Sequence, residues 1–214
     1  MNNKSLIPNS SFLIAFDCCL RLTGAALKLG GEIFYAQEDL GRRQSSELPK
    51  MTERLLREHG LTWSDIDYIA LTNGPGYFTG IRVGAAYATG LAYASGAKII
   101  SVSSLTMLSH AFKRDNNHEK ILTLIYAGHG FVYAEAENFL AAGQYSHDFI
   151  RSWLEDNSDA VIISDDPDRL GLGSTLNIIT VRPDMTSLCE LAEQNIETAI
   201  NPTELKISYY RAPI

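Results

Sequence analysis

The strongest local signal for chemistry in this sequence is a glycine-rich run from Asn73 to Gly80, NGPGYFTG. It follows an apolar, strand-like run and opens a helical pattern, so its backbone N–H groups and the helix dipole suit an anion. No Lys-Ser/Thr pair follows it, and its spacing differs from G-x-G-x-x-G, which excludes the two common phosphate-loop motifs. A tight strand-to-helix turn is the favoured interpretation, and an anion site is the alternative.

The histidines and cysteines are spaced in ways that exclude common metal and redox sites. A metalloprotease pair needs two histidines four residues apart on one helix face, and no two histidines here have that spacing. The three cysteines include the adjacent Cys18 and Cys19 and form no C-x-x-C motif. We therefore predict no metal site, no bound cofactor, and reduced, buried thiols. The histidines are His59, His110, His118, His129 and His147.

The charge balance limits the partners of this chain. Its 214 residues suit one to two domains, and 18 Lys and Arg against 25 Asp and Glu give a net charge of −7. A protein that binds nucleic acid alone needs a basic face, which this composition does not favour. The N-terminus has no apolar signal-peptide core, and the apolar run 81–94 is short and contains Arg82. We expect a cytoplasmic protein without membrane contact.

Apolar runs and their periodicity predict alternating strands and helices that would position the glycine-rich loop. In the first half we expect strands at 11–16, 22–29, 32–36, 67–71 and 98–102, a helix from Ser45 to Gly60 with Pro49 in its first turn, and a helix at 79–94. The second half repeats this loosely, with strands at 121–125, 132–137, 160–164, 176–181 and 207–210 and helices at 146–154 and 187–196. Mixed sheets flanked by helices indicate an α/β protein with domains at 1–103 and 104–214.

Two stretches carry a resemblance to a known family. NGPGYFTGIRVGAAYATGLAYASGAKIISVSSL, at 73–105, is similar to the TsaB (YeaZ) signature G-P-G-S-F-T-G-L-R-I-G with its later V-S-S-L. RRQSSELPKMTERLLREHGLTWSDIDYIAL, at 42–71, resembles the R-x-H-S-E-x-L helix that precedes it. The resemblance covers nearly the whole chain and is strongest from Ser45 to Leu105. It implies the two-domain fold of the actin-like ATPase and sugar-kinase superfamily, which is ribonuclease H-like.

The resemblance also implies a function. It is a role in making threonylcarbamoyladenosine in tRNAs that read ANN codons, as the non-catalytic partner of a TsaD-type transferase. A TsaE-type ATPase is a further implied partner, with a homodimer when the chain is alone and tRNA bound only through the complex. The alternative is an enzyme, a small ATP-dependent phosphotransferase or ATPase that uses the glycine-rich loop as a phosphate cradle.

Asp17 bears on that alternative. An actin-like ATPase needs carboxylates from both domains around a hydrated metal, and Asp17 at the end of the first strand could supply one. The matching hairpin of the second half, from Ile125 to Gly128, contains no acid. We therefore interpret Asp17 as a strand-end hydrogen-bonding residue and predict no catalytic residue.

The sequence departs from the family's motifs at several positions. The His of R-x-H-S falls on Gln44, and the Ser of the glycine-rich loop falls on Tyr77. This chain lacks the acids and arginines of the family's D-A-R-R-x-E segment. The residues at those places are Tyr126, Gly128, His129 and Phe131.

The helix at 79–94 has no polar face, because apolar or small residues recur around its circumference. The neighbouring helix could cover it, or a partner protein could, and the resemblance favours the partner. Gly80, Gly84 and Ala88 lie on one side, where small side chains permit close helix approach. The predicted partner-binding residues are Leu48, Met51, Leu55, Gly80, Gly84, Tyr87, Ala88 and Leu91.

Overall fold

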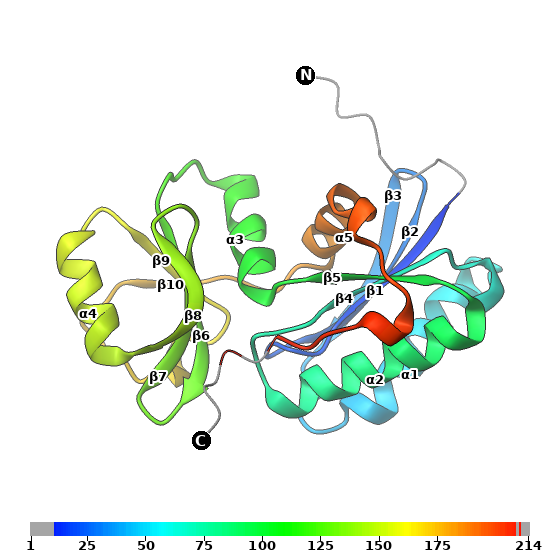
Figure 1. Ribbon diagram of the computed structural model, residues 1–214, viewed down its shortest axis with the longest axis horizontal. Helices are drawn as coiled ribbons and strands as arrows, with labels where there is room; N and C mark the ends of the chain where they lie inside the picture. Colours follow the sequence, from blue (N-terminus) through cyan, green and yellow to red (C-terminus); the bar gives the residue numbers. More distant parts are fainter. Residues whose placement is uncertain (1–10, 209, 211–214) are drawn as a thin grey trace.

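The computed structural model describes residues 11–208 and residue 210, and these form two mixed β-sheets with helices on their faces (Figure 1). The first sheet has the strand order β3-β2-β1-β4-β5, with β1, β4 and β5 parallel and β2 antiparallel to both of its neighbours. Its strands are β1 Phe12–Asp17, β2 Thr23–Leu29, β3 Glu32–Glu38, β4 Tyr68–Thr72 and β5 Lys98–Val102.

Helices cover both faces of the first sheet because its central strands are apolar on both sides. In β1, Ile14 and Phe16 pack beneath α1 (Gln44–Glu58) and α2 (Phe78–Ser95). Leu13 and Ala15 point the other way, toward α5 (Met185–Gln194). This alternation is the two-residue period of a strand. The continuous run FLIAF therefore belongs to a strand buried on both faces.

The second sheet has the order β10-β9-β6-β7-β8. α3 (Ser104–Asp115) packs on the face with Ile121 and Ile125, and α4 (His147–Asp156) packs on the face with Leu122 and Leu124. The strands are β6 Ile121–Gly128, β7 Phe131–Ala136, β8 Leu140–Ser146, β9 Val161–Ser164 and β10 Ile178–Thr180. The predicted α/β class with mixed, helix-flanked sheets is confirmed.

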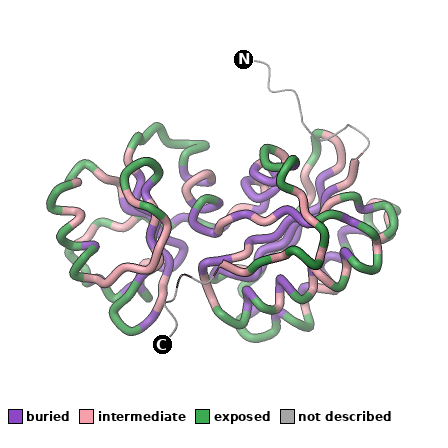
Figure 2. The backbone as a smooth tube through the Cα atoms, viewed as in Figure 1, coloured by how far each residue is buried: buried purple, intermediate pink, exposed green. Residues whose placement is uncertain are grey.

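α3 and α5 form a layer that both sheets share. One apolar cluster runs from Leu13 in the first sheet through Leu188 of α5 and Leu108 of α3 to Ile163 in the second sheet. Figure 2 shows buried residues continuing through the middle of the molecule. The two sheets are therefore joined by hydrophobic core rather than by a linker alone.

The domain boundary predicted at 103/104 needs a correction at its C-terminal end. α5 packs on the first sheet, and Ile200 forms an antiparallel bridge to Ile99 at the edge of that sheet. The segment after β10 thus belongs to the first domain, because its apolar side chains complete that core. The second domain of the described chain runs from α3 to β10.

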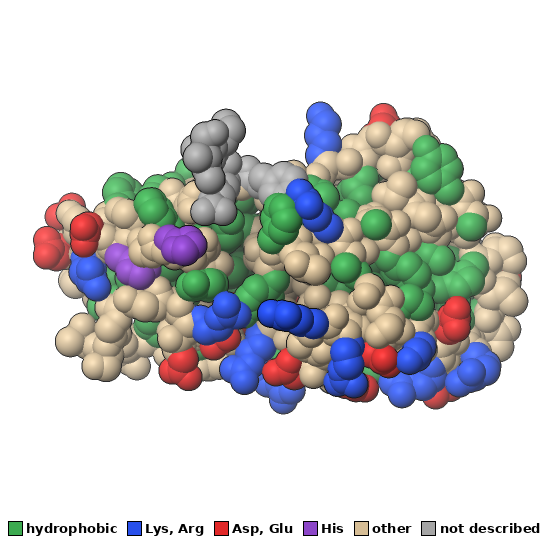
Figure 3. All heavy atoms as spheres, turned by 90° about the horizontal axis from the view of Figure 1, so that it is seen from below, with side chains coloured by type: hydrophobic (Ala, Val, Ile, Leu, Met, Phe, Trp, Pro, Cys, Tyr) green, Lys and Arg blue, Asp and Glu red, His purple; other side chains and the backbone are tan. Residues whose placement is uncertain are grey.

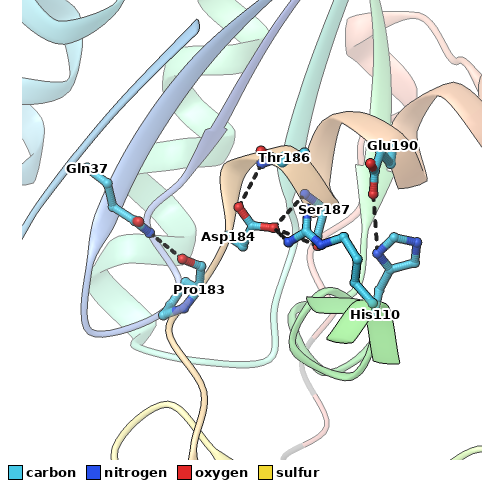
Figure 4. A network of polar contacts seen from close by, with 8 residues as sticks. Gln37, His110, Pro183, Asp184, Thr186, Ser187 and Glu190 are labelled. Carbon is cyan, nitrogen blue, oxygen red and sulfur yellow. Dashed lines mark hydrogen bonds and ion pairs between the residues drawn. The ribbon is translucent and has the colours of Figure 1, made fainter. Parts of the chain in front are cut away.

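Polar contacts fix the start of α5 (Figure 4). Asp184 caps the helix by accepting hydrogen bonds from the backbone N–H groups of Thr186 and Ser187, both at 3.1 Å. Gln37 of β3 donates to the carbonyl of Pro183 at 2.8 Å. An ion pair from Arg114 of α3 to Asp184 joins the two central helices.

Several predicted elements are wrong in detail. Pro49 lies in the sixth position of α1 rather than in its first turn, because the helix begins at Gln44. α3 and β8 were not predicted from the sequence. The strand expected at 207–210 is absent, since Ile207, Ser208 and Tyr210 are irregular and residue 209 lies outside the described residues. Within the described chain, no helix is both long and apolar enough to cross a membrane.

Candidate cleft and partner-binding helix

The glycine-rich loop is packed against the backbone that follows β1. The N–H of Tyr77 donates to the carbonyl of Cys19 at 2.7 Å. A Cβ on Gly76 would lie 2.1 Å from the Cys19 carbonyl oxygen, and one on Gly80 would lie 1.8 Å from that of Cys18. These glycines make room for a neighbouring peptide rather than for a phosphate. The geometry thus favours the structural turn over the anion site.

Both cysteines of that neighbouring peptide are buried thiols, as predicted. Burial raises the pKa of Cys19 to about 12, and its Sγ contacts the carbonyl oxygen of Thr72 at 3.2 Å. Burial raises the pKa of Cys189 in α5 to about 12 as well. Thiols held protonated in this way are poor nucleophiles, so these cysteines serve packing.

Asp17 is fully buried at the end of β1 and is held by neighbouring donors. Its Oδ1 accepts hydrogen bonds from the Thr72 hydroxyl and, at 2.8 Å, from the N–H of Cys19. Its Oδ2 has no hydrogen-bond partner within the described residues. The pKa of Asp17 is raised from 3.8 to about 7, chiefly by burial and to a smaller extent by the negative charge of Asp165. The predicted hydrogen-bonding role is therefore the one that the structure shows.

The acid that acts on Asp17 is Asp165, which follows β9 with Asp166 and is largely buried. The sequence pattern had pointed to the hairpin at Tyr126 as the place of a second carboxylate. Their signal was the Ser164-Asp165-Asp166 run directly after an apolar strand. Even so, no three His, Cys, Asp or Glu side chains of the described chain are grouped closely enough to hold a metal ion.

The raised pKa of Asp17 predicts how an Asp17→Asn variant will behave. The unfolded carboxyl loses its proton near pH 4, whereas the folded one keeps it until about pH 7. Because the folded state binds more protons in that window, the parent loses up to about 4 kcal/mol of unfolding free energy as the pH rises through it. We expect the variant not to show this loss, and urea unfolding at several pH values measures it.

A matched control is Asp168→Asn, because Asp168 is exposed and lies in the segment after β9 that also contains Asp165. This control should follow the parent at every pH. Parallel unfolding free energies for the parent and the Asp17→Asn variant between pH 4 and pH 8 would contradict the assignment of a buried, protonated Asp17.

A cleft of about 890 Å³ opens beside the start of α2. The guanidinium of Arg21 lies in this cleft, 3.7 Å from the carboxylates of Asp39 and Asp166. The backbone N–H of Arg21 donates a hydrogen bond to the Asp165 carboxylate at 3.0 Å. These contacts join the loop after β1 to the loop after β9. The residues that line the cleft are Leu20, Arg21, Asp39, Gly41, Arg42, Gln44, Tyr77, Phe78, Thr79, Gly80, Asp166 and Arg169.

Two positions that depart from the family motif meet across this cleft. The Arg169 guanidinium lies 4.9 Å from the ring centre of Tyr77 and 4.6 Å from that of Tyr126. Arg169 also donates to the Tyr77 hydroxyl at 2.6 Å. A cation between two aromatic rings is attracted to both, so the Tyr77–Arg169 contact joins the two domains while Tyr126, in the same domain as Arg169, helps to hold the guanidinium in place.

The remaining departures have local structural roles. Gln44 is buried and donates to the carbonyl of Cys18 at 3.3 Å. Gly128 and His129 form the β6–β7 turn, with φ of 83° and 52°. Phe131 starts β7 and is exposed.

Most residues predicted to bind a partner are buried in the core of this chain. Leu48, Met51 and Leu55 of α1 and Ala88 of α2 point toward the first sheet and pack in its core. Gly80 and Gly84 are also buried, beside Cys18. Buried side chains cannot contact a partner directly, so these six do not form a surface. Tyr87 and Leu91 are partly buried, and Tyr87 is further held by a 2.7 Å hydrogen bond to Thr52.

The opposite side of α2 is exposed, which corrects the expectation of burial all round. Phe78 is 55% and Tyr93 62% exposed, with the exposed small residues Ala86 and Gly90 between them. Arg82 stacks on Phe78, with its guanidinium carbon 3.7 Å from the ring centre. We call these five residues the outer α2 face. Figure 3, which views the molecule from the side of α1 and α2, shows hydrophobic side chains gathered on this half, with Lys and Arg along one edge.

Comparison with known proteins places the chain in a family. Residues 34–161, more than half of the chain, match the sequence pattern of the TsaD family, described as tRNA N6-adenosine threonylcarbamoyltransferase. The chain belongs to the TsaD family. This match extends from the first sheet into the second.

The chain is also similar to curated proteins named TsaB. The tRNA threonylcarbamoyladenosine biosynthesis protein TsaB of Haemophilus influenzae is 32% identical over 121 residues, which are 56% of this chain and 51% of that protein. TsaB of Escherichia coli is 28% identical over 150 residues, 70% of this chain and 62% of that protein. The matched part thus spans about half of the first of these relatives.

Solved structures confirm the fold expected for the family. A Pseudomonas aeruginosa protein described as similar to the peptidase YeaZ has a TM-score of 0.79 and 23% identity, and the match covers 94% of this chain and 100% of that one. YeaZ of Pseudomonas aeruginosa has a TM-score of 0.75 and 21% identity, with 93% and 99% covered. The resemblance to TsaB and the actin-like fold are therefore both confirmed.

Proposed function

We propose that this chain is a non-catalytic partner subunit of a TsaD-type transferase in the threonylcarbamoyladenosine modification of tRNAs that read ANN codons. The names of its relatives support the pathway. The chain matches only part of the length of those relatives, so its activity and its partner are both part of this proposal.

The geometry beside β1 supports the non-catalytic part of this proposal. Asp17 is fully buried and is already engaged by Thr72 and Cys19. The carbonyls of Cys18 and Cys19 occupy the space that the loop glycines leave open. These observations disfavour the phosphotransferase alternative, in which the same loop would cradle phosphate.

The outer α2 face is the single observation that carries the partner role. It exposes two large aromatic side chains around small residues on a regular helix, an arrangement that lets another helix approach closely. The partly buried Tyr87 and Leu91 lie along its margin. We place the TsaD contact here, and the same face would pair two copies when the chain is alone. Contact with a TsaE-type ATPase, tRNA binding through the complex and a cytoplasmic location belong to the same proposal.

Co-expression with the TsaD homologue of the same organism tests this function. We expect the two chains to elute together in size-exclusion chromatography, with both identified by mass spectrometry. The isolated chain should neither hydrolyse ATP nor modify tRNA. Separate elution of two folded chains would contradict the partner role. Magnesium-dependent ATP hydrolysis that Asp17→Asn abolishes would favour the enzyme alternative.

A further inference from the structure

The edge strand β8 of the second sheet carries neither a charge nor a proline over its whole length, Leu140–Ser146. The other edges of the two described sheets are protected. β3 has Glu32 and Glu38 at its ends, β10 is three residues long, and β5 is bridged by Ile200. An unprotected edge presents open N–H and C=O groups to which another strand can pair. β8 is therefore a docking surface, and it lies in the second domain, apart from the outer α2 face.

The register of β8 on β7 shows which of its backbone groups lie on the open side. The N–H of His147 donates to the carbonyl of Gly130 at 3.0 Å, in the same register that places Gly143 and Tyr145 opposite residues of β7. In an antiparallel pair every second residue bonds to the neighbouring strand. His147, Tyr145 and Gly143 thus bond toward β7, and the N–H and C=O groups of Gln144 point to the open side.

The side chain of Tyr145 holds this edge in an extended form. Its hydroxyl donates to the carbonyl of Ala141 in the same strand at 2.7 Å. Its ring covers Gly143, where a Cβ would lie 3.2 Å from the ring, and it stacks on Phe149 of α4 with the ring centres 4.7 Å apart. An aromatic ring over an edge glycine stabilises the strand. The β-bulge lies between Leu140 and Gly143, so the rest of β8 keeps a regular register.

The occupant that suits this edge is a second copy of the chain. A two-fold axis sets the strand antiparallel to itself, and β8 carries no charge that would repel its copy. With Gln144 on the axis, Ala142 of each copy lies opposite Ser146 of the other, so the outward-facing residues pair throughout. Gly143 then lies opposite Tyr145 of the other copy, where the missing side chain leaves room for the ring. We propose that two copies of this chain pair through β8 and join their second sheets into one.

Sedimentation velocity of an Ala86→Arg protein tests this proposal, because the substitution blocks pairing through the outer α2 face and leaves β8 unchanged. An edge contact of a few residues is small, so we expect a dimer that dissociates on dilution below about 0.1 mM. Hydrogen exchange of the Gln144 amide should slow as the dimer forms. A protein that stays monomeric at its highest soluble concentration would overturn the proposal.

Charge substitutions at Gln144 in the same Ala86→Arg protein locate the axis. Gln144→Lys and Gln144→Glu each set like charges opposite one another, so each should weaken the dimer about tenfold or more. An equimolar mixture of the two should restore the dimer, because opposite charges then meet. Tyr35→Lys, on the edge strand β3, is the matched control and should leave the dimer unchanged.

Circular dichroism establishes that each of these variants is folded. A folded Gln144→Lys variant that dimerises as tightly as the Ala86→Arg protein would place the contact on another surface and overturn the assignment to β8. A mixture of the two charge variants that stays monomeric would overturn the two-fold pairing at Gln144.

Discussion

An Ala86→Arg variant should remain folded and should bind a TsaD-type transferase at least a hundredfold more weakly than the parent. Ala86 is exposed at the middle of the outer α2 face, so a long side chain meets no atoms of this chain's core. In a close helix contact the same side chain would overpack the interface and bury a charge. A hundredfold corresponds to about 2.7 kcal/mol of binding free energy. Titration of the purified partner, followed by calorimetry, measures the loss.

Two further arginine variants separate binding from folding. Ser152→Arg introduces the same side chain on the exposed surface of α4, and it should bind like the parent. Ala88→Arg, at a residue that the sequence predicted to bind the partner, should unfold the chain because Ala88 is fully buried against the first sheet. Parent-like affinity in a folded Ala86→Arg variant would place the partner on another surface.

Gly80→Ala should destabilise the chain by about 3 kcal/mol or more, although alanine is the better helix former. The new Cβ would lie 1.8 Å from the backbone oxygen of Cys18, and a peptide in this buried loop cannot move aside as a flexible side chain could. Either the start of α2 or the loop after β1 must shift. Urea unfolding, monitored by circular dichroism, gives the change in unfolding free energy.

Gly90 lies in the same helix and supplies a matched comparison. A Cβ there meets no atom within 4 Å, and the position is exposed. Gly90→Ala should therefore stabilise the chain by about 0.5–1 kcal/mol through helix propensity. A Gly80→Ala variant as stable as the Gly90→Ala variant would refute the close packing of residues 18–19 against α2.

The sequence predicted the first sheet and α2 well because their signals are local. The apolar run of β1, the Gly30-Gly31 turn and the end of α2 at Gly96 each follow from a few neighbouring residues. α3 was missed although Ser103 caps it and Leu105, Leu108 and Phe112 form its apolar stripe. The missed β8 had a weaker signal, since none of its residues is fully buried.

The side of α2 that meets a partner could not be predicted from its residue types. Small residues at Gly80, Gly84 and Ala88 indicate close approach by another backbone, and the sequence does not say which one. In the structure that backbone is the chain's own residues 18–19, together with the sheet. Asp165 near Asp17 is likewise a long-range pairing, because 148 positions separate the two residues along the chain.

The return of α5 to the first sheet has a consequence during protein synthesis. Leu13 and Ala15 are synthesised well before the helix that covers them, which begins only at Met185. Until then the nascent chain carries a strand with one bare hydrophobic face, even after the second domain has been made. Such a surface attracts chaperones or other nascent chains. The first sheet therefore completes its core only after the second sheet has been made.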